Sequence, residues 1–503
     1  MKKIIFAFTV LLFAGTAKAQ NVTDALRYSV NELNGSARFR AMSGAFGALG
    51  GDLSGLSVNP AGSAVFLKSF AGATLDFETL SNETTFMNGL TSSKNSNVDF
   101  GQAGAAFVFT TSDEENNWKK FTLAFNFNKD ASLDRDFTAA GVNTRSIDQY
   151  FLSHAEGVPL DLLVPLEDET VSELYSFLGE NEGFSAQQAM LGYQAFIISA
   201  EDPEDFENTA YFSEVGPGSF DQEYAYVTSG LNGRFAFNFA SQYKDFLYLG
   251  LNLNAHFIDY ERVTSFFETN NNADSSINEI LFEETLRTMG NGFSFQLGTI
   301  ARLGSSLRAG LAYQSPVWYN IAEETTQFLR TDSAEFGSAV VDPDVVNVYP
   351  EYKLQTPAEY TASMAYLFGN HALVSLGYSY KDYSTTRFKP QDDPAFDFQN
   401  QLMSTELGGS STIRIGGEYR FNELSLRAGY RMQDSPYEAA GSIGDLQGYS
   451  GGIGYDFGSI TIDLSYDHAS RDENPRLFQT GLTDRAHVER DLSHVALSLN
   501  FGI

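Results

Sequence analysis

The stretch FLYLGLNLNAHF, residues 246–257, decides the fold, because its side chains alternate strictly between two kinds. One set is apolar and consists of Leu247, Leu249, Leu251 and Leu253; the other is smaller or more polar and consists of Tyr248, Gly250, Asn252 and Asn254. A period of two places successive side chains on opposite faces of an extended strand. This segment therefore predicts a strand with one oily face and one polar face.

The same alternation returns along most of the chain, in FTLAFNFN (121–128), ITIDLSYDH (460–468) and VALSLNFGI (495–503). A water-soluble sandwich also alternates. However, these segments run for about ten to fifteen residues, whereas a soluble strand has about five or six and a tilted strand crossing a bilayer needs about nine to eleven. Their polar face carries Asn, Ser, Gly, Arg and Asp, which suits a wet lumen.

The alternating segments predict fourteen strands, near 66–79, 98–110, 117–128, 223–240, 245–261, 280–303, 306–318, 351–368, 372–383, 410–421, 423–433, 447–457, 459–469 and 488–501. Short turns alternate with long connections at 80–97, 129–222, 262–279, 319–350, 384–409, 434–446 and 470–487. Short periplasmic turns and longer outer loops are typical of outer-membrane barrels. We therefore predict an all-β fold, a closed 14-stranded antiparallel transmembrane β-barrel.

The first residues predict export. Lys2 and Lys3 precede an apolar run at 4–15, and AKA (17–19) is a small-residue cleavage site. This pattern predicts a signal peptide at 1–19 and a mature chain from Gln20. Export together with the predicted barrel places the protein in the outer membrane. The chain has no cysteine, so its fold does not depend on disulfides.

The formal net charge of −32 excludes nucleic acid as a partner, because phosphates repel an acidic surface. The acid is concentrated in connections such as 199–223. Two interpretations stay open for these residues. They are solvated loops, or they bridge through divalent cations to anionic lipid headgroups.

The leader before the first strand does not alternate. Residues 20–64 are rich in glycine and alanine, which lets a chain fold tightly. A fourteen-stranded barrel is too wide for its own side chains to fill. We therefore predict a lumenal hatch at 20–64 and a barrel wall at 65–503, whose connection 129–222 forms a long, partly helical outer loop. Asn59 and Pro60 form a rigid corner that leads from the hatch into the barrel wall.

Several motifs resemble the FadL/TodX family of outer-membrane transporters for long-chain fatty acids and other hydrophobic compounds. They are AMSGAFGAL (41–49), GGDLSGLSVNPAGSAVF (50–66), LQTPAEYTASMAYLF (354–368) and LRAGYRMQDSPY (426–437). The resemblance implies that Asn59, Pro60 and Ala61 lie in the hatch near bound substrate. It also implies sideways release through a gap made by a kink in the third strand. Only Asp52 stands where the family often has two adjacent acids.

The predicted function is transport of hydrophobic compounds by capture at the outer loops, binding in the plugged lumen and lateral release. Candidate binding and gating residues are Asn59, Pro60, Ala61, Phe39, Phe46, Leu53 and Leu56. We expect hydrophobic small molecules (fatty acids or aromatics) and outer-membrane lipids as partners, a monomer, and no cofactor, metal site or enzymatic activity. The alternatives are a protein-binding shuttle barrel of a secretion system and a general porin.

Overall fold

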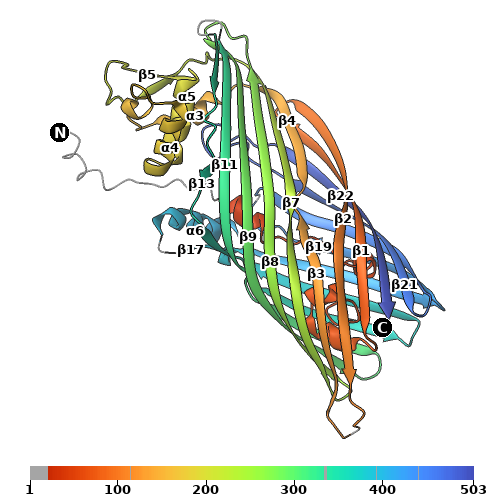
Figure 1. Cartoon of the computed structure of the whole chain (residues 1–503). Coiled ribbons are helices and arrows are strands. Elements are labelled where there is room, and N and C mark those ends of the chain that lie inside the picture. The colour runs from red at the N-terminus through yellow and green to blue at the C-terminus, as the bar shows by residue number, and fades with distance from the viewer. Residues whose placement is uncertain (1–20, 114, 334–336, 392, 440, 503) are drawn as a thin grey trace.

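The computed structural model describes residues 21–113, 115–333, 337–391, 393–439 and 441–502. One antiparallel sheet closes into a barrel (Figure 1). Its wall is built, in order, from β1 (Phe70–Phe86), β2 (Gly89–Thr110), β3 (Trp118–Ser132) continued by β4 (Arg135–Asn143), β7 (Phe220–Tyr243), β8 (Leu247–Thr269), β9 (Ile277–Leu303), β10 (Leu307–Gln314) continued by β11 (Trp318–Ser333), β14 (Tyr352–Gln355) continued by β15 (Glu359–Phe368), β16 (Ala372–Asp382), β18 (Gly409–Phe421), β19 (Leu424–Gln433), β20 (Ile443–Asp456), β21 (Ile460–Glu473) and β22 (His487–Gly502).

The prediction of fourteen wall positions is confirmed. Within the described residues the sheet has twenty strands, but three of them continue another strand, and β12 (Gly337–Val341), β13 (Asn347–Val348) and β17 (Arg387–Lys389) are short additions at one end. The first and last strands pair from Phe70 opposite Gly502 to Thr85 opposite His487. This ladder closes the barrel and leaves no sheet edge, which a bilayer requires.

The alternation in 246–257 gives β8 the predicted apolar outer face and polar inner face. Leu253 faces outward and is 46% exposed, while its neighbour Asn252 faces the lumen and is 1% exposed. Outward side chains elsewhere are also large and apolar, among them Phe121, Phe237, Leu297, Tyr378, Leu426, Leu464 and Leu497. An exposed apolar band of this kind needs lipid around it.

One end of the barrel has short turns, as at 244–246, 304–306, 369–371, 422–423 and 457–459. The prediction of a long connection at 80–97 is wrong, because β1 and β2 extend through it and meet in a turn at Met87 and Asn88. Residues 80–97 stand beyond the apolar band, where both faces are polar, so the period of two disappears although the strands continue. For the same reason β11 continues to Ser333 and β8 to Thr269.

A helical cap lies beside the upper end of β11 (Figure 1). It contains α3 (Asp148–Ala155), η3 (Leu160–Leu162), α4 (Val171–Asn181), α5 (Phe184–Gln194), β5 (Ile198–Ala200) and β6 (Tyr211–Ser213). The helices α3, α4 and α5 all lie within the connection 129–222. Met190 and Ile197 are buried in the core of the cap. Among the described residues, no helix is long and apolar enough to span a bilayer.

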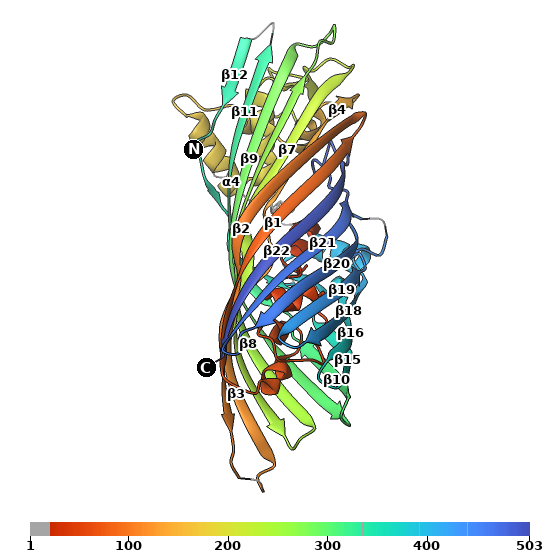
Figure 2. The ribbon, with the colours of Figure 1, turned by 90° about the vertical axis from the view of Figure 1, so that its right-hand side faces the viewer.

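The N-terminal segment lies inside the barrel and forms the hatch, coloured red in Figures 1 and 2. It contains α1 (Val22–Arg27), α2 (Ala37–Ala41), η1 (Ser54–Ser57) and η2 (Pro60–Val65). Residues of α1 pack against α6 (Pro394–Glu406), which follows η4 (Tyr383–Thr385). The predicted signal peptide at 1–19 lies outside the described residues.

Candidate transport site: hatch, lumenal cavity and a break in the wall

The Asn59–Pro60 corner fastens the hatch to the wall. Asn59 caps η2 by accepting a hydrogen bond from the Ala61 N–H at 3.1 Å, and its Nδ2 donates to the carbonyls of Gly47 (2.7 Å) and Thr299 (3.0 Å). The wall leaves room for this contact at Gly298, where a Cβ atom would lie 2.0 Å from Asn59 Oδ1. The corner is therefore a buried joint between η2 and β9.

Neutral amide side chains of the wall satisfy the carbonyl groups of the hatch on this side. A compact irregular segment inside a barrel would otherwise leave backbone acceptors without donors. The contacts are Asn126 to Leu53 O at 3.3 Å, Asn252 to Leu56 O at 2.9 Å, Gln296 to Ser57 O at 2.8 Å and Asn238 to Pro60 O at 2.9 Å. The polar face of β3, β7, β8 and β9 thus acts as a docking surface for residues 53–60.

Ion pairs hold the other side of the hatch. Arg40, on α2, is fully buried; its Nε lies 2.8 Å from Asp467 on β21 and its Nη1 lies 3.4 Å from Asp76 on β1. The Nε of Arg38 lies 2.8 Å from Glu418 on β18. Because burying an unpaired charge is costly, these pairs fix the position of α2 strongly.

Asp52 organises the hatch internally. Its Oδ2 accepts from the Ser36 hydroxyl at 2.7 Å, and its Oδ1 accepts from the Ser54 N–H at 2.8 Å. Burial raises the pKa of Asp52, while Arg38 and these hydrogen bonds act in the opposite direction. The single acid at this position therefore ties α2 to η1.

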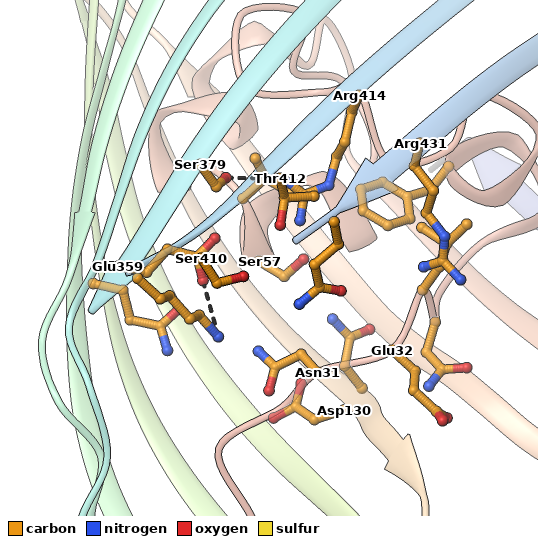
Figure 3. Close-up of a pocket in the computed structure, with 18 of the residues that line it drawn as sticks. Asn31, Glu32, Ser57, Asp130, Glu359, Ser379, Ser410, Thr412, Arg414 and Arg431 are labelled. Atoms are coloured by element: carbon orange, nitrogen blue, oxygen red, sulfur yellow. Dashed lines mark hydrogen bonds and ion pairs between the residues drawn. The ribbon is translucent and has the colours of Figure 1, made fainter. Parts of the chain in front are cut away.

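A cavity of about 80 Å³ lies between the hatch and the wall (Figure 3). The hatch contributes Leu33, Phe39 and Val58 as its apolar lining. Most of the remaining lining is polar or charged and comes from Glu32, Asp130, Glu359, Lys381, Arg414 and Arg431, among others. Lys129 and Asp130 both turn inward because β3 shifts its register with β7 between Lys129 and Ala131.

The structure separates the predicted site residues into three groups. Of the predicted site residues, only Phe39 lines the cavity. Phe46 packs with Phe39 in one buried cluster, and Leu53 and Leu56 lie in another. Asn59, Pro60 and Ala61 lie at the joint with β8 and β9. A gating role for the joint residues stays a prediction, as does cargo contact by the buried apolar residues.

The wall is interrupted beside the cavity. The ladder between β2 and β3 ends at Gln102 opposite Asn128, and the third wall strand breaks at Leu133 and Asp134, between β3 and β4. The strand β4 pairs with β7, and within the described residues no backbone ladder joins it to β1 or β2. Side chains of the β1–β2 hairpin donate to its carbonyls instead; for example, Ser93 Oγ donates to Asp136 O at 3.0 Å. The break faces Gly230, whose φ of +126° few other residues adopt.

Polar contacts bridge the break. Asn97 Nδ2 donates to Asp134 Oδ2 at 2.9 Å, and Lys129 Nζ contacts Asp99. Lys129 also lines the cavity. The cavity and the break are therefore separated by a few side chains and not by a hydrogen-bonded sheet.

Sequence reasoning missed the charged residues that position the hatch. Arg38 and Arg40 flank Phe39 in a segment otherwise made mostly of small residues, and that isolation was the available signal. Their partners Glu418 and Asp467 stand on inward faces of strands far along the chain. His494 joins the same network between Asp467 and Glu78, at 3.1 Å from each.

A closed barrel with an apolar outer band and a plug in its lumen has the architecture of an outer-membrane transport channel. The chain belongs to the outer membrane protein transport protein family (OMPP1/FadL/TodX), whose model matches residues 230–496. A comparison with curated protein sequences finds no significant match.

Two solved structures share the fold across nearly the whole chain. A FadL homologue of Pseudomonas aeruginosa matches with a TM-score of 0.53 and 12% identity, over 94% of this chain and 99% of that chain. The toluene transporter TodX of Pseudomonas putida matches with a TM-score of 0.52 and 14% identity, over 94% and 99%. At these identities the likeness shows the fold alone.

Proposed function

We propose that the protein carries hydrophobic compounds of the long-chain fatty acid type across the outer membrane, after export through a cleaved signal peptide at 1–19. Removing each CH₂ from water is favourable by about 0.8 kcal/mol, so a sixteen-carbon chain resists release into water by roughly 12 kcal/mol. A useful conduit therefore avoids an aqueous step. Cargo is captured at the outer loops, moves to the lumenal cavity and leaves sideways into lipid as the hatch moves.

The break between β2 and β4 is the observation that carries this proposal. It lies next to the cavity, and Lys129 belongs to both. Side chains can separate at lower cost than a sheet ladder, in which each opened residue loses backbone hydrogen bonds. The end of the break nearest the cavity lies beside Val98 and Phe100, whose apolar side chains are exposed on the outer face. A route from the cavity through this end would reach the lipid without crossing water.

A crosslink across the break tests the route. The chain has no cysteine, so Asn97→Cys with Asp134→Cys can be joined by a short reducible bis-thiol reagent. We expect uptake of hexadecanoate by cells to fall at least tenfold on crosslinking and to recover on reduction. The matched control is Thr79→Cys with Ser96→Cys, which joins β1 to β2 within an intact ladder. Full uptake through the crosslinked break would exclude lateral release there.

Hatch gating has its own test, with Asn59→Ala and deletion of residues 21–34. We expect both changes to alter hydrophobic uptake, because the first loosens the joint at β9 and the second removes the cover of the cavity. Unchanged uptake in both would remove the hatch from the mechanism.

A second candidate is a protein-binding shuttle barrel of a secretion system. The helical cap favours it, since Leu166, Phe177 and Phe206 expose 65%, 45% and 60% of their surface. Binding of exported proteins, with loss of secretion on deletion of the gene, would support this function over transport. A general porin is the third candidate, and swelling of proteoliposomes in small sugars would support it.

A further inference from the structure

The barrel wall has a second interruption, which β7, β8 and β9 separate from the break at β4. Residues 315–317 divide β10 from β11, and residues 356–358 divide β14 from β15 in the next wall position. These two gaps face each other, because β10 pairs with β15 as far as Gln314 and the pairing of β11 with β14 begins at Trp318.

A proline in each gap prevents a regular ladder. Pro316 and Pro357 have no N–H to donate, and proline is rare inside a sheet for this reason. Across the two gaps the described residues form one backbone bond, from the Thr356 N–H to Val317 O at 3.0 Å. The Val317 N–H donates to Thr356 Oγ1 at 2.9 Å, so a side-chain hydroxyl replaces a carbonyl as its acceptor.

The interruption continues into the following wall position. The pairing of β15 with β16 ends at Glu359 opposite Lys381, and that of β14 with β17 begins at Gln355 opposite Arg387. Between these pairs, residues 383–386 leave the ladder, and most of them form η4. Three adjacent wall positions are therefore interrupted side by side. We call this region the proline window, and it consists of residues 315–317, 356–358 and 383–386.

A small cavity lies directly behind the proline window. Its volume is about 10 Å³, and the window contributes Val317, Thr356 and Pro357 to its lining. The hatch closes its other side with Tyr28 and Ser29. This cavity adjoins the larger lumenal cavity, because both are lined by Asn31, Asp130, Gln314 and Lys381. At the window, a single layer of wall side chains therefore stands between the lumen and the outer face.

The proline window lies where the wall leaves the outer leaflet. From the short-turn end, β10 runs for eight residues before the window, and a tilted strand crosses a bilayer in about nine to eleven. The exposed outward side chain below the window is Leu311, whereas Asn320 and Lys353 are exposed above it. Trp318 and Tyr360 flank the window on the outer face, and such aromatic side chains are enriched at membrane interfaces.

We propose that the proline window is a lateral entrance through which hydrophobic molecules dissolved in the outer leaflet reach the lumenal cavity. This inference rests on the proposed transport function and adds a second source of cargo to capture at the outer loops. A long hydrocarbon chain partitions strongly from water into lipid, so cargo arriving from outside collects in this leaflet. Opening the window between residues 315–317 and 356–358 breaks the two bonds of Thr356, whereas a regular ladder would lose more backbone bonds.

Photolabelling tests the entrance without transport. The unmodified full-length barrel is placed in lipid nanodiscs that contain hexadecanol with a diazirine at the end of its chain. Light should attach this probe to hatch residues 28–31, behind the window, as well as to lipid-facing residues of the wall. Labelling confined to the lipid-facing residues would overturn the proposal.

A crosslink across the window identifies the route that the probe takes. The double variant Val317→Cys, Pro357→Cys, joined by a short reducible bis-thiol reagent, should lose at least nine-tenths of the labelling at 28–31 and regain it on reduction. The matched control is Leu311→Cys with Ala362→Cys, which joins opposite residues in the intact ladder of β10 and β15 and should label normally. Full labelling at 28–31 behind the joined window would also overturn the proposal.

Uptake separates this entrance from the proposed function. Cells that express the joined window variant should take up hexadecanoate at least fivefold more slowly than the same cells after reduction. Labelling of residues 28–31 in the unmodified barrel without any hexadecanoate uptake would retain the entrance and reject transport. Uptake that the joined window does not change, with residues 28–31 unlabelled, would reject the entrance and retain transport.

Discussion

The two sides of the lumen hold the hatch by different chemistry. On β3, β7, β8 and β9, neutral Asn and Gln side chains donate to the carbonyls of residues 53–60. On β18, β21 and β1, carboxylates pair with Arg38 and Arg40 of α2. Each amide contact contributes about 1 kcal/mol, whereas breaking a buried ion pair costs about 3–5 kcal/mol. The hatch therefore has one side held by many weak contacts and one held by a few strong contacts.

This difference indicates which part of the hatch responds to charge. The side of the hatch held by Arg38 and Arg40 depends on charged wall residues, Glu418, Asp467 and Asp76. Loss of a wall carboxylate would release α2, while the amide contacts of residues 53–60 do not depend on it. Hydrogen exchange of two peptides, 36–46 and 53–65, can report the two sides separately.

The largest expected effect is that of Arg40→Gln. The change leaves Asp467 and Asp76 buried without their arginine, at a cost of about 3–5 kcal/mol. Amide hydrogen exchange in residues 36–46 should become at least a hundredfold faster, with a much smaller change in residues 53–65. The control is Arg145→Gln in the cap, whose partner is Asp484 at 2.6 Å and whose side chain is 45% exposed. Equal acceleration of both peptides would mean that the hatch behaves as one unit.

Gly298→Ala is expected to have the next largest effect and to act on the opposite side. The new methyl group would lie 2.0 Å from Asn59 Oδ1 and 2.6 Å from Pro60 Cδ, so the joint must shift. Such overpacking costs about 1–3 kcal/mol. Faster exchange should be confined to residues 53–65. In the control, Gly417→Ala, the nearest atom is Leu373 O at 3.6 Å, an ordinary contact; matching effects from both variants would refute a specific joint.

The sequence predicted the barrel well because lipid imposes one rule on every strand. Residues 246–257 alternate because one face meets lipid and the other meets the lumen. The rule weakens where outward residues are polar, so the pattern at 80–97 predicts a loop although β1 and β2 continue through it. The hatch was predictable as a compact insert from its small residues.

The contacts of the site were not predictable in the same way. Arg40 and Asp467 are 427 residues apart, and their meeting depends on the register of closure between β1 and β22. The opposition of Arg414 and Arg431 likewise depends on the turn at Asn422 and Glu423, which sets the register of β18 and β19. A pattern of local alternation contains no information on such long-range pairs.

A smaller effect is expected for Asn252→Ala. The variant removes the donation to Leu56 O at 2.9 Å and to Gln296 Oε1 at 3.0 Å, which should cost about 1 kcal/mol. Exchange in residues 53–65 should rise about fivefold and respond little to salt. Asn254→Ala is the matched control, because Asn254 donates to Ser294 Oγ at 3.1 Å and this bond does not involve the hatch. An effect at 36–46 instead would contradict the division of the two sides.

The smallest effect on stability is expected at the break, for Asn97→Ala. Its hydrogen bond to Asp134 is partly exposed, so its loss should cost about 0.5–1 kcal/mol and leave both hatch peptides unchanged. If cargo leaves through this break, the same variant should raise the rate of hexadecanoate uptake about twofold, since one of the few bridging contacts is gone. Thr79→Ala removes a hydroxyl contact within the intact β1–β2 ladder and should change neither quantity. Lower uptake in Asn97→Ala would indicate that the bridging residues guide cargo and do not restrain it.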